Sequence, residues 1–144
     1  MGQKNNLVAS LTYLGALPFL VAALCCFVGL KELPYLGSVE LLVYSYAIMI
    51  ACFMAGTHWG YVIRSDSTFN PILVTSVMIL LVLWVLWIAN IPSYSLCLVP
   101  VYLLLWCVDY LLLIYEYESH IYFKMRTKVT VLVILSLLVI YLKT

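Results

Sequence analysis

The chain has 144 residues, of which 67% are hydrophobic and 9% are charged, and its formal net charge is +1. Soluble domains carry about 25% charged residues, so this composition excludes an ordinary soluble domain, and the near-neutral charge speaks against a nucleic-acid partner. We expect a single integral membrane domain over residues 1–144, with membrane lipids around it.

Apolar runs that are long enough to cross a bilayer occupy almost the whole chain. A spanning helix needs about 18 or more predominantly apolar residues. The five expected spans cover residues 7–30, 38–63, 71–90, 94–115 and 125–142. The predicted fold class is therefore all-α, an integral membrane bundle of five transmembrane helices.

Polar breaks and capping residues separate these spans. Ser38 is the expected N-cap of the second span, and Asn70 followed by Pro71 is typical of a helix start. The segments Arg64–Ser67 and Ile91–Ser93 are expected to end the second and third spans.

The distribution of Lys and Arg predicts the orientation. Five spans place the two termini on opposite sides of the membrane. Lys31 and Lys143 fall on the C-terminal side, whereas five cations fall on the N-terminal side. The positive-inside rule then puts the N-terminus inside and the C-terminus outside. The five cations are Lys4, Arg64, Lys124, Arg126 and Lys128.

Polar and small residues share one face of the second span. They follow one another at steps of three or four, which places them on one side of a helix. We expect this stripe to face other helices, with Ala51 and Ala55 as packing residues. Gly56 and Gly60 form a GxxxG unit, which predicts the close approach of another helix. The stripe consists of Glu40, Tyr44, Ala47, Ala51, Ala55 and His58.

Asp109 is a charged residue inside the apolar fourth span. A carboxylate at membrane depth costs about 2.5–3.5 kcal/mol on insertion scales, so it needs a partner and is a candidate functional residue. His58 and Asp109 each lie about six residues from the same end of the bundle, which puts both about 9 Å below one surface. Arg126 opens the fifth span at that surface, and its long side chain can reach the carboxylate. We predict that these three residues form one polar cluster.

The candidate ligand-binding or proton-handling residues are these three together with Trp59, Tyr44 and Glu40 of the second span. A purely structural interpretation stays open, because polar side chains inside membranes also hydrogen-bond one helix to another.

Motifs of common enzymes do not occur in the chain. There is no HExxH, no GxSxG and no Gly-rich phosphate loop, and the two histidines are His58 and His120. We assign no catalytic residue, no metal site and no cofactor, and an enzyme is disfavoured. Five spans do not divide into two equal inverted repeats, which also disfavours a monomeric alternating-access carrier.

Four parts of the chain carry a likeness to a known family: Leu14–Phe19, Gly56–Gly60, Asp109 and Tyr122–Thr130. The most specific of them reads Gly-Thr-His-Trp-Gly. Together they resemble the transmembrane protein 69 family, which is defined by a domain of unknown function numbered 3429. The resemblance implies a five-helix protein of the bacterial inner membrane or the mitochondrial inner membrane, and it implies no biochemical activity.

Two hypotheses of function stay open at this point. In the first, a small inner-membrane protein uses the cluster to bind or conduct protons, or to bind a small polar or anionic ligand. In the second, the protein is a structural or accessory subunit of a larger membrane complex or a homo-oligomer, and the cluster only joins helices. An enclosed, water-filled cavity that touches His58 would favour the first. A dry, fully paired cluster together with an exposed groove of small residues would favour the second.

Overall fold

The structure, a computed structural model, describes residues 2–63, 71–89 and 94–143. All five helices of this part of the chain are long and apolar enough to cross a membrane, which confirms the all-α transmembrane bundle. The expected cap at Asn70 and the expected breaks at 64–67 and 91–93 lie outside the described residues. The helices are α1 (Gly2–Phe27), α2 (Val39–Ile63), α3 (Pro71–Ala89), α4 (Tyr94–Ile114) and α5 (His120–Lys143).

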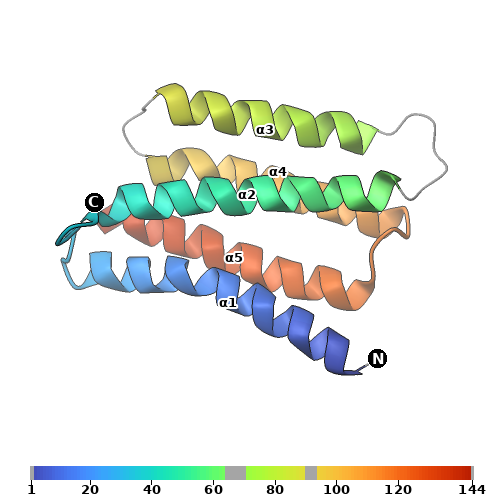
Figure 1. Ribbon diagram of the computed structural model, residues 1–144, viewed down its shortest axis with the longest axis horizontal. Coiled ribbons are helices and arrows are strands. Elements are labelled where there is room, and N and C mark those ends of the chain that lie inside the picture. The colour runs from blue at the N-terminus through green and yellow to red at the C-terminus, as the bar shows by residue number, and fades with distance from the viewer. Residues whose placement is uncertain (1, 64–70, 90–93, 144) are drawn as a thin grey trace.

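The helices alternate in direction along the chain (Figure 1). In this view α2 and α4 lie in the middle, with α3 on one side and α1 and α5 on the other. The two termini lie at opposite ends of the bundle. We call the end at which α1 and α5 begin and α2 and α4 finish the N-terminal end. Which side of the membrane it faces stays a prediction.

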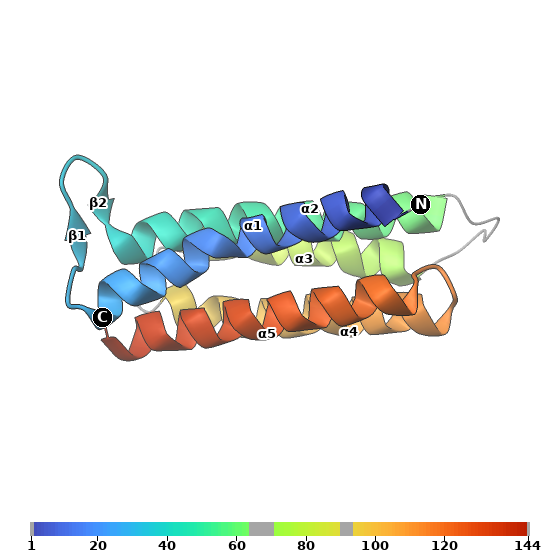
Figure 2. The same cartoon turned by 90° about the horizontal axis from the view of Figure 1, so that it is seen from below.

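A short hairpin that the sequence did not predict joins α1 to α2 at the opposite end of the bundle (Figure 2). Its strands, β1 (Glu32–Leu33) and β2 (Gly37–Ser38), pair antiparallel. The Ser38 hydroxyl accepts a hydrogen bond from the Leu41 N–H over 3.2 Å, which confirms Ser38 as the N-cap of α2.

The first helix ends earlier than expected because of a glycine. α1 finishes at Phe27 rather than at Leu30. Gly29 has φ +86°, the left-handed conformation that glycine adopts without steric cost. The Leu30 N–H then reaches back to the Cys25 carbonyl over 2.8 Å, as in a Schellman motif. The apolar sequence thus extends three residues beyond the end of α1, which is why the predicted span was too long.

A tight turn between α4 and α5 positions Glu118. Glu116, two residues after the end of α4, lies in the left-handed region with φ 59°. Ser119 caps α5 through its hydroxyl. As a result α5 begins at His120, before the expected start at Met125. Within this turn Glu118 is buried, whereas Tyr115, Glu116 and Ser119 are exposed.

The stripe on α2 faces other helices, as predicted. α2 packs against α1, α3 and α4. Glu40, at the hairpin end, is half-buried. The other members are at most 3% exposed: Tyr44, Ala47, Ala51, Ala55 and His58.

The GxxxG prediction is wrong for contacts within this chain. Gly56 and Gly60 are exposed, and a Cβ built on either meets no described atom within 4 Å. The cause is helical phase, since consecutive residues of a helix point about 100° apart. With Ala55 buried, Gly56 and Gly60 face outward.

Ala51→Leu is expected to lower the free energy of unfolding by about 1–3 kcal/mol, because the added side chain has no free volume in the core. Ala51 is 0% exposed. Gly60→Leu is the matched control, since the open space beside Gly60 accepts a side chain. Unfolding in mixed detergent micelles measures both, and equal losses would contradict the packing of α2 described above.

Candidate functional site

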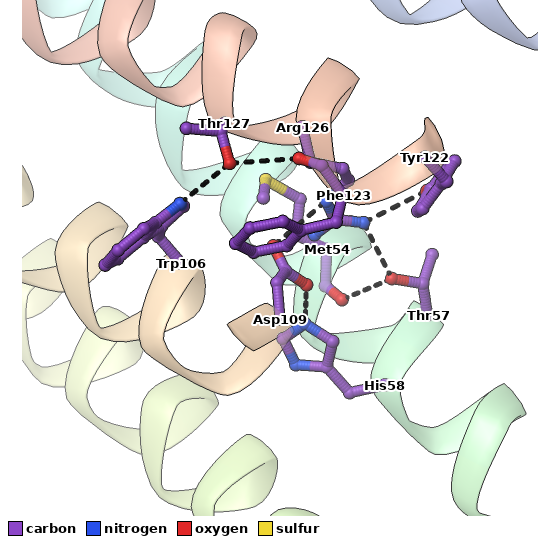
Figure 3. Close-up of polar contacts among 9 residues, drawn as sticks. All are labelled: Met54, Thr57, His58, Trp106, Asp109, Tyr122, Phe123, Arg126 and Thr127. Carbon is purple, nitrogen blue, oxygen red and sulfur yellow. Dashed lines mark hydrogen bonds and ion pairs between the residues drawn. The ribbon is translucent and has the colours of Figure 1, made fainter. Parts of the chain in front are cut away.

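His58, Asp109 and Arg126 meet at the N-terminal end of the bundle, as predicted (Figure 3). His58 Nε2 lies 2.8 Å from Asp109 Oδ1, and Arg126 Nε donates to Asp109 Oδ2 over 3.0 Å. Their exposed fractions are 0%, 1% and 5%. Each residue lies one to two turns inside its helix, about 8–9 Å from the helix end. One carboxylate therefore joins α2, α4 and α5.

Arg126 forms further hydrogen bonds through a guanidinium nitrogen other than the one that donates to Asp109. Its Nη1 donates to the Tyr122 hydroxyl over 3.1 Å and to the Thr57 hydroxyl over 3.3 Å. The guanidinium carbon also lies 5.6 Å from the centre of the Tyr122 ring, within cation–π range. Thr57 in turn donates to the Met54 carbonyl, so its position is fixed by α2 itself. Arg126 is thus held in place from both sides.

Two nitrogen atoms of the cluster have no partner among the described residues. A bidentate guanidinium–carboxylate pair engages both carboxylate oxygens. Here His58 takes one oxygen of Asp109, and Arg126 Nη2 is left without an acceptor. Because an ionised carboxylate only accepts, His58 Nε2 carries the hydrogen, and Nδ1 is a buried acceptor without a donor. The cluster is therefore not fully paired.

Glu118 belongs to the same polar region, and nothing in the sequence pointed to it. It is 7% exposed, and neither carboxyl oxygen has a partner in the described part of the chain. Burial, and after it the negative charge of Asp109, raise the pKa of Glu118 to about 7, although the positive charge of Arg126 lowers it. A glutamate between two spans is ordinarily solvated. The short turn from α4 to α5 is what buries this one.

A cavity of ≈ 350 Å³ lies beside the cluster, between α1, α2 and α5. Its polar wall includes Arg126, Tyr122 and Thr57, whereas neither His58 nor Asp109 borders it. Of the ion pair, therefore, only the positively charged Arg126 contacts the cavity. The apolar walls come from three helices and include Leu11, Phe19, Ile50, Phe53, Val129 and Val133.

The structure does not bring the other three candidate residues to the cluster. Trp59 follows His58 directly, so it points away from the cluster, and it is 40% exposed. Tyr44 stacks on Trp87 with ring centroids 5.8 Å apart. Glu40 accepts a hydrogen bond from Ser95 over 3.4 Å. Glu40 and Tyr44 precede His58 by about 27 and 21 Å along α2, near the hairpin end.

The chemistry of the site follows from its groups. Within residues 2–63, 71–89 and 94–143, no three His, Cys, Asp or Glu side chains are grouped so as to hold a metal ion. What the site offers is two carboxyl groups, one imidazole, one guanidinium and adjoining hydroxyls. These groups can exchange protons and can donate hydrogen bonds to an acceptor.

Five membrane-spanning helices around a buried ionic cluster define a small integral membrane protein. The family model described as "Protein of unknown function (DUF3429)" matches residues 5–142, and the chain belongs to this family. The family resemblance noted in the sequence is confirmed to that extent, and the name transmembrane protein 69 is not part of the match. No curated protein and no solved structure matches the chain.

Proposed function

We propose that the protein binds and releases a proton near neutral pH at the N-terminal end of the bundle, with Glu118 as the exchanging group. The observation that carries the proposal is a buried Glu118 whose carboxyl oxygens have no partner among the described residues, near an ion pair that is already formed. The cluster of His58, Asp109 and Arg126 was predicted from the sequence, whereas Glu118 was not.

The charge count of the cluster supports a proton on Glu118. Asp109 and Glu118 are two carboxyl groups that sense each other and one guanidinium. Arg126 donates to Asp109, so the carboxyl group that is hydrogen-bonded to the guanidinium is Asp109 and not Glu118. A second buried carboxylate without hydrogen bonds would carry a large desolvation cost, and a proton removes that cost. Sites that exchange protons typically place two neighbouring acids in environments that move their pKa values apart.

His58 adds a buried hydrogen-bond acceptor to the site. Its Nε2 is committed to Asp109, whereas Nδ1 stays available as an acceptor. Nδ1 is therefore a hydrogen-bond acceptor beside the ion pair between Asp109 and Arg126.

Infrared difference spectra recorded during a pH titration test the proposal. We expect the C=O stretching band of one protonated carboxyl group to disappear as the pH rises through about 7. Glu118→Gln should lack this band. Glu116→Gln is the matched control, because Glu116 lies in the same turn and is exposed. A band that persists in Glu118→Gln, or wild-type spectra without any such band, would contradict the proposal.

A second candidate function, an accessory subunit, is supported by one surface. Gly56 and Gly60 leave open space on the outer face of α2, with Trp59 half-exposed between them. Small residues of this kind let a helix of another subunit approach closely. This role needs no proton on Glu118, so the infrared titration also separates the two candidates.

A further inference from the structure

We propose that the cavity between α1, α2 and α5 binds a single-chain amphiphile with a carboxylate head group, its hydrocarbon chain along the apolar walls and its head at Tyr122 and Arg126. This inference goes beyond the proposed proton site and does not depend on it, because it stands on the shape and charge of the cavity.

The apolar part of the cavity fits a hydrocarbon chain. Its lining runs along α1 from Val8 to Phe19 and along α5 from Tyr122 to Val133. Each stretch covers 11 residue steps, or about 16 Å of helix. Most of the lining side chains in between are apolar, with Thr12, Thr130 and Tyr102 as the polar exceptions, and Gly15 leaves open space at the α1 wall.

The polar end of the cavity favours an acceptor that carries negative charge. The Tyr122 hydroxyl accepts a hydrogen bond from Arg126 Nη1, and no described residue accepts its own hydrogen. Arg126 is the one charged residue among those that line the cavity, and its counter-ion Asp109 is not among them. A carboxylate there would accept the Tyr122 hydrogen and interact with the guanidinium charge.

The depth of Arg126 distinguishes a fatty-acid-like ligand from a bilayer phospholipid. Arg126 lies about 9 Å inside the end of α5, a helix of 24 residues that is apolar enough to cross a membrane. With the end of α5 at the level of the phosphate groups, Arg126 would lie below them. A phosphodiester would have to carry its charge to that depth. A carboxylic acid can enter in its neutral form and lose its proton beside Arg126, which avoids the cost of moving a charge through apolar surroundings.

Photo-crosslinking with palmitate that carries a diazirine in its chain tests the inference, with the full chain in phosphatidylcholine nanodiscs. We expect labelled peptides from Phe19 and from the Val129–Val133 segment. Unlabelled palmitate should compete. Hexadecanol has a similar chain and a neutral head, and it should compete about tenfold more weakly, as expected for one lost charge-assisted hydrogen bond. Acetate, which has no chain, should not compete.

Two matched leucine variants place the ligand. Gly15→Leu fills the cavity and should abolish labelling, while Gly56→Leu adds the same side chain in open space away from the cavity and should not. Tyr122→Phe keeps the ring and should weaken binding about tenfold by removing the hydroxyl donor.

Four results would overturn the inference. Labelling that persists in Gly15→Leu would place the ligand elsewhere. Equal competition by hexadecanol would show that the head is not recognised, and equal competition by acetate would show that the chain is not. Stronger competition by phosphatidylglycerol than by palmitate would assign the cavity to an anionic phospholipid. None of these results bears on the infrared titration of Glu118, so the two proposals can fail separately.

Discussion

Asp109→Ala is expected to lower the free energy of unfolding by about 3–5 kcal/mol, the largest loss from a single substitution in this protein. The side chain is 1% exposed and holds both His58 and Arg126. Its removal leaves a guanidinium that is 5% exposed without a counter-ion, deep in an apolar bundle. The cost comes mainly from this uncompensated charge and less from the lost attraction.

A double variant separates those two contributions. Asp109→Leu combined with Arg126→Met replaces the ion pair by apolar side chains, and it should recover most of the stability lost in Asp109→Ala. Unfolding in mixed micelles with a rising fraction of denaturing detergent measures each variant. If the double variant is as unstable as the single one, the pair is not held as a buried ion pair, and the cluster described here would be wrong.

The stability of the folded chain is expected to fall as the pH rises from about 4.5 to about 7, through Glu118. Its pKa is raised in the folded state, so within this range the folded chain binds more protons than the unfolded chain. Below the range both states are protonated, and above it the folded state carries a buried carboxylate. The expected loss across the range is about 1–3 kcal/mol.

Glu118→Gln should remove this pH dependence, because the amide stays neutral. The variant should match the wild type at the acid end of the range and be more stable than the wild type above a pH of about 7. Groups that do not interact with Glu118 contribute equally to both proteins and cancel in the difference between the two curves. A difference that does not change with pH, or one that favours the wild type at high pH, would contradict a buried Glu118.

The helix bundle and the three-residue cluster could be predicted because both follow from local rules. Apolar runs and their polar breaks give the spans, and rise per residue gives the depth of His58 and Asp109. A charge inside the membrane needs a partner, and few candidates occur at that depth. Helical periodicity also predicted the buried face of α2. Trp59, Gly56 and Gly60 lie off that face, and the GxxxG spacing does not say whether the approaching helix belongs to the same chain.

Composition and periodicity by themselves determined a five-helix membrane protein, the buried face of α2 and the need of Asp109 for a partner. The tertiary structure decided which groups stay unpaired, and these are the groups on which function depends. Glu118 is buried because Glu116 and Ser119 make a tight turn between two packed helices. The cavity exists because α1, α2 and α5 leave a gap beside Arg126. The burial of Glu118 and the cavity both depend on contacts between segments that are far apart in the chain. Helix formation within an apolar span depends only on the residues of that span.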